Sequence, residues 1–229
     1  MKQVSLLIFI ILAPSLYSQE LNMLNLAKYD NQWYHFGFTL GLMSNNLKID
    51  YNDYQTSEKK VQSMSTPGFN VGIICDVKVL KNINIRFTPS LTFTQRDLSF
   101  ILIDNHEIIK SVENSNLDLP LLIKYRANRY GNIRPYFLLG SKFTYDMASK
   151  KEVEDINLFK LDDIDYGLEF GFGIDIYLPY FKLSPELKYF YGLNNLLKGN
   201  QSEIINNELI NSNLEALYSR SLLFSLTFE

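Results

Sequence analysis

Nine charged residues occupy positions that alternate with apolar ones, and any chemistry inside this protein would have to use them. They are Arg86, Asp118, Lys124, Arg126, Lys142, Glu169, Asp175, Glu186 and Lys188. Paired carboxylates could act as general acid and base, because each shifts the pKa of the other. Mixed charges in a confined interior would instead form ion pairs, since an unpaired buried charge is costly. We interpret the nine residues as a paired network, with a narrow ion path as the functional alternative.

The other residue types that catalyse reactions or bind metals show no productive spacing. Neither of the two histidines, His35 and His106, has a partner at the spacing of a metal site or a Ser-His-Asp triad. The single cysteine, Cys75, excludes an intramolecular disulfide and a cysteine zinc cluster. Six carboxylates between residues 152 and 165 lack the spacing of an EF-hand. We therefore expect no enzymatic activity, no cofactor, no metal site and no small-molecule substrate.

Composition excludes one partner class and points to extended structure. The formal net charge is -3 and no run of Lys or Arg exceeds two residues, which argues against nucleic acid as a partner. Aromatic residues make up 14% of the chain, including 15 Tyr and 16 Phe, as is typical of pleated surfaces and of belts at membrane interfaces. Mean hydropathy is -0.08, a value that does not separate soluble from membrane proteins when apolar and polar residues alternate.

Alternating residues identify the elements that must position the nine charges. At the end of the chain Leu222, Phe224, Leu226 and Phe228 alternate with a mostly polar set, which is the period of a strand with one apolar face. Seven earlier stretches share this period and begin near residues 34, 69, 83, 117, 136, 166 and 181. Short turns join some of these strands. The long connections lie near residues 44–67, 96–115, 147–163 and 193–216.

This pattern predicts an all-β fold, an eight-stranded antiparallel up-and-down transmembrane β-barrel with four long outer loops and three short periplasmic turns. A soluble barrel with the apolar faces inside is the alternative, because periodicity does not distinguish inside from outside. Glycines on the polar face favour the membrane orientation, since small residues suit a crowded lumen. The residues that we expect to face lipid include Phe87, Leu91, Phe172, Ile174 and Phe224.

The start of the chain has the pattern of an export signal. Residues 1–18 combine Lys2, an apolar run from Val4 to Ala13 and small residues before Ser18, so we predict a signal peptide. The apolar run is shorter than the ~20 residues of a membrane-spanning helix. We expect residues 19–32 to be a periplasmic lead-in, acting as a plug or a docking tail, and 33–229 to form the barrel. The expected location is the Gram-negative outer membrane, after signal-peptide cleavage.

The run from Tyr29 to Gly41, YDNQWYHFGFTLG, resembles the opening of the PorT-like outer-membrane barrels of Bacteroidota. That family is tied to type IX secretion and gliding motility. The resemblance implies a non-enzymatic part of the protein secretion machinery, whose partners are outer-membrane lipid and other secretion proteins, and it supplies no catalytic residues. A stand-alone small barrel, a minor porin or adhesin-type surface protein, is the alternative. The candidate partner contacts are Leu21, Leu24, Leu26, Tyr51 and Tyr54.

Overall fold

A single closed sheet dominates the computed structural model. The described residues are 24–51, 61–64, 66–101, 107–147, 162–196, 204–205, 208–209 and 214–229. Its strands are β1 (Tyr34–Tyr51), β2 (Val61–Met64), β3 (Thr66–Lys78), β4 (Ile83–Phe87), β5 (Ser90–Ile101), β6 (Glu107–Arg126), β7 (Ile133–Asp146), β8 (Ile164–Tyr177), β9 (Lys182–Gly192) and β12 (Leu214–Phe228). Strands β10 (Ile204–Ile205) and β11 (Glu208–Leu209) pair separately.

The sheet closes because its first strand pairs on both sides. β1 is antiparallel to β3 along one edge and to the last strand, β12, along the other. β4 and β5 keep one register against β3, in which Phe87 pairs with Cys75 and Ser90 pairs with Gly72. They are therefore one wall strand, interrupted at Pro89, which has no N–H to donate. Within the described residues the wall thus has eight antiparallel strands, which confirms the predicted barrel.

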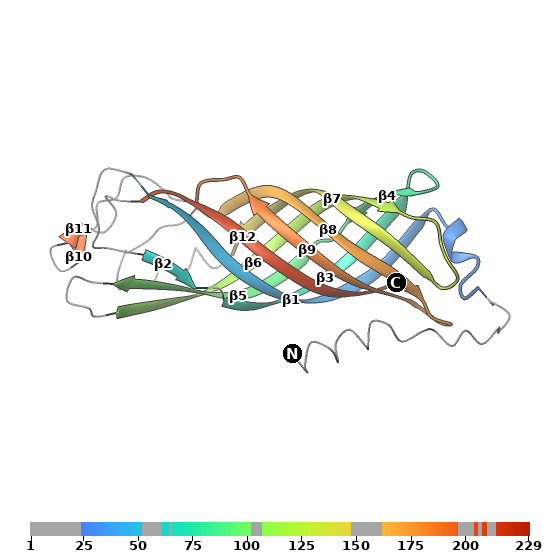
Figure 1. Ribbon diagram of the computed structural model, residues 1–229, viewed down its shortest axis with the longest axis horizontal. Helices are drawn as coiled ribbons and strands as arrows, with labels where there is room; N and C mark the ends of the chain where they lie inside the picture. Colours follow the sequence, from blue (N-terminus) through green and yellow to red (C-terminus); the bar gives the residue numbers. More distant parts are fainter. Residues whose placement is uncertain are drawn as a thin grey trace, which may run out of the picture.

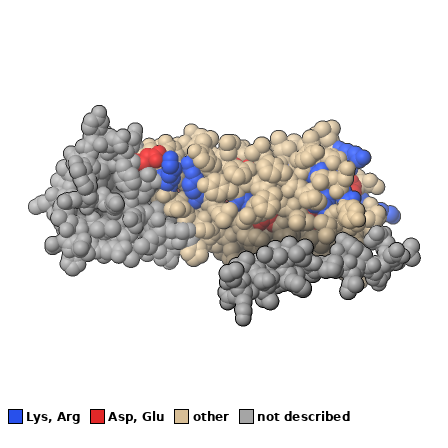
Figure 2. All heavy atoms as spheres, viewed as in Figure 1, with Lys and Arg blue, Asp and Glu red and all other residues tan. Residues whose placement is uncertain are grey.

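The apolar side chains of the wall point outward. The five residues expected to face lipid are 39% to 60% exposed, whereas the lumen-facing Lys124 and Asp175 are fully buried. Figure 2 shows the result: residues other than Lys, Arg, Asp and Glu dominate the middle of the visible face. A water-soluble barrel would bury its aromatic residues and expose its charges. The membrane orientation of the strands is therefore the one that fits this wall.

The strands extend further than their alternation indicated. β5 continues to Ile101 and β6 begins at Glu107, so most of the predicted 96–115 loop is instead a hairpin that projects beyond the barrel (Figure 1). β1 likewise continues to Tyr51, inside the predicted 44–67 loop. Outside the lipid band both faces of a hairpin meet water, so nothing imposes a period of two on its sequence. The predicted boundaries of these two loops were wrong for this reason, whereas β7 ends at Asp146 and β8 begins at Ile164, as the predicted 147–163 loop requires.

The opposite end of the barrel has short turns and carries both ends of the described chain. Residues 79–82, 127–132 and 178–181 join the strands there. The short 3-10 helix η1 (Tyr29–Asn31) precedes β1 at this end, where β12 also finishes (Figure 1). Among the described residues no helix has the length and apolar character needed to cross a membrane.

The outward register predicts where a charge is tolerated. Phe172→Arg should destabilise the barrel by about 2–4 kcal/mol, because it places a charge against lipid near the middle of β8. Tyr180→Arg is the matched control, since Tyr180 lies in the turn between β8 and β9 and is 92% exposed; its cost should be about 0–1 kcal/mol. Urea unfolding in lipid vesicles, followed by the fluorescence of the single tryptophan, Trp33, measures both. Equal stability of the two variants would contradict the register.

Candidate functional site

All nine of the charged residues singled out from the sequence lie on the inner face of the wall, and each is at most 7% exposed. With partners that the sequence did not single out, they form three groups along the lumen. We call these the central cluster, the long-loop cluster and the mouth cluster. The mouth cluster lies at the short-turn end.

The central cluster is organised around Arg86 on β4. Its Nε and Nη2 donate to Asp76 Oδ2 on β3, at 3.0 and 2.8 Å, and Nη2 also lies 2.8 Å from Glu229 Oε1. Its Nη1 donates to Glu186 Oε1 on β9. One guanidinium thus holds three carboxylates from different parts of the wall, and this requires further cations nearby.

Lysines supply those cations. Lys182 Nζ lies 2.7 Å from Glu229 Oε2 and 3.7 Å from Asp175 Oδ1. Lys124 Nζ approaches the same Asp175 oxygen at 2.9 Å, and Lys188 Nζ lies 3.2 Å from Glu186 Oε2. The cations of the described cluster are Arg86, Lys124, Lys182 and Lys188, and its carboxylates are Asp76, Asp175, Glu186 and Glu229. Their charges balance, as a buried group of ions requires.

At the same level a tyrosine of β7 extends over β8 to β9, because a glycine makes room for it. Tyr136 Oη donates to Glu186 Oε1 at 2.6 Å, and Lys124 Nζ lies 3.7 Å from the centre of the tyrosine ring. Gly173 pairs with Tyr136 on one side and Glu186 on the other. A Cβ atom at Gly173 would lie 2.4 Å from Tyr136 Oη. This close approach explains one of the glycines on the polar face of β8.

The long-loop cluster is smaller and less tightly paired. Lys142 Nζ lies 3.9 Å from Asp118 Oδ1 and 3.8 Å from Glu169 Oε2. The hydroxyl groups of Thr92 and Thr144 donate to the two oxygens of Asp118, at 2.6 and 2.7 Å. Charge and hydrogen bonds from the two neighbouring strands, β5 and β7, therefore satisfy Asp118.

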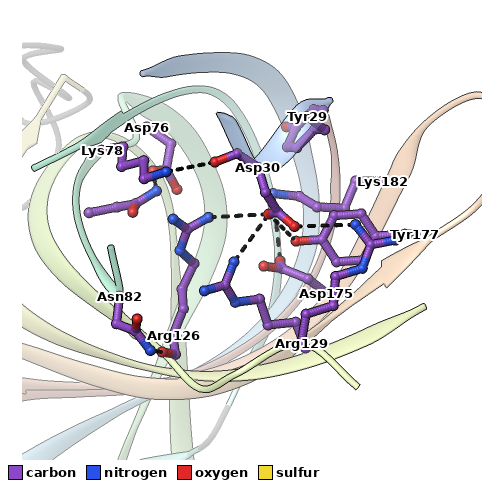
Figure 3. A network of polar contacts seen from close by, with 12 residues as sticks. Tyr29, Asp30, Asp76, Lys78, Asn82, Arg126, Arg129, Asp175, Tyr177 and Lys182 are labelled. Atoms are coloured by element: carbon purple, nitrogen blue, oxygen red, sulfur yellow. Dashed lines mark hydrogen bonds and ion pairs between the residues drawn. The ribbon is translucent and has the colours of Figure 1, made fainter. Parts of the chain in front are cut away.

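The mouth cluster surrounds one carboxylate, that of Asp30 in η1 (Figure 3). Arg134 Nη1 lies 3.1 Å from Asp30 Oδ1, and Arg129 Nη1 lies 3.2 Å from Oδ2. Arg126 Nη1 is more distant, at 3.9 Å from Oδ1. The hydroxyl of Tyr177 donates to Oδ1 at 2.9 Å. Three guanidinium groups thus converge on one carboxylate.

Further contacts fix residues 24–32 against the barrel end. The backbone N–H of Asn25 donates to Asn132 Oδ1 at 2.9 Å, and Lys78 Nζ donates to the carbonyl oxygen of Asp30 at 2.7 Å. The ring of Tyr29 stacks on His35 with 3.9 Å between centroids, and its hydroxyl donates to Glu229 Oε2 at 2.9 Å. We call residues 24–32 the cap. Of the two roles considered for the lead-in, this part of it has the contacts of a plug.

Electrostatics favour the ionised form of Asp30. Partial burial alone would raise the pKa of Asp30, but hydrogen bonds from Tyr177 and Arg129 and the charge of Arg134 hold it below its ordinary value of 3.8. Because the shift is downward, the contribution of Asp30 to cap docking is complete above pH 3.8 and is lost as the pH falls through the lower value in the folded protein. Burial and the nearby Glu229 carboxylate raise the pKa of Tyr29, so its hydroxyl remains a donor.

The candidate partner residues have varied environments. Leu24 is exposed, and Leu26 is half-buried with a left-handed backbone, φ 52°. Tyr51 ends β1, and its side chain is outside the described part of the structure, as are Leu21 and Tyr54 entirely. These residues therefore remain candidates.

Several residues of these clusters were not singled out from the sequence, among them Asp76, Lys182, Asp30 and Glu229. Asp76 and Lys182 occupy the polar phase of β3 and β9, so extending the alternation to the strand ends would have found them. Asp30 and Glu229 lie outside the strands, where periodicity gives no signal.

The remaining reactive residue types lie apart from one another. His35 faces the lumen and is buried, and Cys75 is a half-buried free thiol in the outward phase of β3. His106 and residues 152–155 fall outside the described ranges. Within those ranges there is no group of three or more His, Cys, Asp or Glu side chains that could hold a metal ion.

Comparisons with known proteins were made for both sequence and fold. The family model described as "Outer membrane protein beta-barrel domain" matches residues 19–198. A comparison with curated proteins finds no match. Similar solved structures include the outer membrane protein OprG from Pseudomonas aeruginosa, with 13% identity, TM-score 0.48, and coverage of 84% of this chain and 93% of that chain.

Two further similar structures are the outer membrane protein AlkL and the protein Ail. AlkL, solved in DMPC lipid bilayers, has 12% identity and TM-score 0.43, covering 94% of this chain and 93% of that chain. Ail, the attachment invasion locus protein of Yersinia pestis, has 13% identity and TM-score 0.37, covering 86% of this chain and 98% of that chain.

From the contacts of the central cluster we predict that Glu229 stabilises the barrel. Glu229→Gln removes the charge shared by Arg86 and Lys182, so unfolding should become easier by roughly 1.5–3 kcal/mol, the range for charged hydrogen bonds. Asp50→Asn is the matched control, because the Lys48–Asp50 pair is exposed and should contribute less than about 1 kcal/mol. Urea titration in lipid vesicles compares the two. A Glu229→Gln barrel as stable as the control would show that the cluster does not hold the wall.

Proposed function

We propose that this chain, which belongs to the family of outer membrane protein β-barrel domains, works by contact as a non-enzymatic component of the type IX protein secretion machinery. The protein is located in the outer membrane of a Gram-negative cell. Barrels of this kind have short turns on the periplasmic side and longer loops outside. The cap and the mouth cluster would then face the periplasm, and the projecting β5–β6 hairpin would face outward.

The observation that carries the proposal is the filled lumen. An eight-stranded barrel has an interior only wide enough for side chains, and here the buried ions of the central cluster span it from β3 to β9. Its carboxylates are bound to cations, so none is placed as a free general base. A barrel without an open lumen acts through the surfaces outside the lipid band.

Two such surfaces are available. At the outer end the β5–β6 hairpin extends to Ile101 and Glu107. At the short-turn end Trp33, Tyr130 and Tyr180 are exposed, and large aromatic residues of this kind often anchor protein interfaces. Residues 24–32 are occupied by the barrel itself, so the hairpin is the stronger candidate for contact with another secretion protein.

The type IX assignment itself depends on the resemblance of residues 29–41. In that run Tyr29, Asp30 and His35 make the contacts that hold the cap on the lumen. A stand-alone small outer-membrane barrel, a minor porin or adhesin-type protein, would need the same contacts. These contacts are therefore compatible with both candidate functions, and a cellular experiment separates the two.

A gene deletion scored for export of secreted cargo provides that experiment. We expect cargo to accumulate in the periplasm of the deletion strain, because a missing contact in the machinery stops export. Complementation with the full chain should restore export. A chain lacking residues 99–109, which would join the paired residues Leu98 and Lys110, should assemble but fail to restore it.

The control for assembly is heat-modifiable migration of the shortened chain in outer-membrane fractions. Normal export in the deletion strain would refute the secretion role and leave the stand-alone barrel. Normal export with the shortened chain would refute only the hairpin as the contact surface.

A further inference from the structure

The mouth cluster carries more positive charge than its one carboxylate balances. Arg126 and Arg129 face Asp30 (Figure 3), and Arg134 Nη1 lies 3.1 Å from the same carboxylate. Lys78 adds a fourth cation, and its contact is with the backbone carbonyl of Asp30 and not with the carboxylate. The nearest group of acidic residues, the central cluster, is already balanced by its own cations. Among the described residues a surplus of positive charge therefore remains at this end of the lumen.

Two of the three guanidinium groups are well supported by neutral acceptors. Arg129 Nε donates to the carbonyl of Gly131 at 2.8 Å, and its guanidinium lies 3.7 Å from the centre of the Tyr177 ring. Arg134 Nε donates to the carbonyl of Ala127 at 2.7 Å. These two arginines are therefore held in place by the barrel wall and the turn, independently of Asp30.

Arg126 differs from both. Its side chain is 1% exposed, and its distance to Asp30, 3.9 Å, is too long for a hydrogen bond. Its Nε and Nη2 have no hydrogen-bond partner among the described residues. These two atoms lie along one edge of the guanidinium, and that edge matches the spacing of two oxygens in a phosphate or carboxylate group.

Charge decides which kind of acceptor fits this edge. A buried guanidinium without acceptors is unfavourable, and either a neutral or a charged acceptor would relieve it. The surplus cations at the mouth favour a charged one, because each additional arginine or lysine attracts an anion. A tetrahedral oxyanion can also accept from several donors at once, as a cluster of arginines requires.

We propose that the short-turn mouth of the lumen binds a small oxyanion of the phosphate class through Nε and Nη2 of Arg126. Asp30 is a built-in competitor, since its carboxylate shares the same three cations. Phosphate chemistry has two sources at this position, free inorganic phosphate and the headgroup of a phospholipid. The site does not depend on the secretion role, because it is formed by the barrel and its own cap.

Isothermal titration of the purified, folded full chain with inorganic phosphate, in a non-ionic detergent at pH 7 and low salt, tests the site. The wild type should bind, and Arg126→Met should bind about tenfold more weakly, as expected for loss of a charged hydrogen-bond pair. Arg126→Lys keeps the charge but loses the two-donor edge, so it should also be weaker. Arg220→Met is the matched control, because Arg220 lies at the other end of the barrel and donates to two backbone carbonyls.

The Asp30→Asn variant distinguishes a role of Asp30 as a competitor of phosphate from a purely structural role of this residue. Removing the competing carboxylate should tighten phosphate binding about threefold or more, since it increases the net positive charge around the ligand. Heat-modifiable migration verifies that each variant is folded. Absence of binding by the wild type, or equal binding by wild type and Arg126→Met, overturns the site. Weaker binding by Asp30→Asn overturns the role of Asp30 as a competitor.

The same titration in nanodiscs identifies the source of the phosphate. Equal phosphate affinity in phosphatidylglycerol discs and in detergent assigns the site to free phosphate. If the wild type binds phosphate more weakly in the discs than in detergent, and if this difference disappears in Arg126→Met, the site is assigned to the lipid headgroup. In that case the headgroup competes with free phosphate for Arg126. Both results support the site.

Discussion

The need to pair buried charges inside a narrow barrel is the constraint on which this structure depends. The wall turns most of its apolar residues outward, so the described interior has only a small apolar cluster, Leu122, Tyr136 and Leu138, and is held together mainly by ions. Arg86 alone connects β3, β9 and the last residue of the chain through carboxylates. Breaking such a group by removing one partner is costly, because the remaining charges stay buried. Gly173 contributes to the same arrangement, because it leaves the space that the side chain of Tyr136 needs.

The two ends of the described chain meet in this network. Glu229 follows the closing strand, and its carboxylate contacts Arg86, Lys182 and the hydroxyl of Tyr29. The cap therefore cannot complete its contacts until β12 has paired with β1. Closure of the wall and closure of the lumen are coupled through one side chain. The coupling also explains why a segment with the composition of a flexible lead-in has defined contacts over residues 24–32.

Much of the fold was predictable because a lipid-facing wall imposes a period of two. The same period placed all nine charged residues on the inner face, although it could not say which of them would touch. The period of two gave no information about residues outside the lipid band. The outer part of the β5–β6 hairpin looked like a loop because its sequence does not alternate, and Asp30 and Glu229 lie outside the strands. Arg126 shows a further limit: its position was predictable, but its unpartnered edge depends on side-chain geometry that no pattern encodes.

The central claim is that paired side chains close the lumen, so that the protein works through its surfaces. Single-channel recording of the purified wild-type protein in planar lipid bilayers tests it most directly. The account predicts no steady conductance at either polarity, because ions of the central cluster span an interior with room only for side chains. A reproducible open channel with steady conductance would contradict it and would favour a pore-forming role.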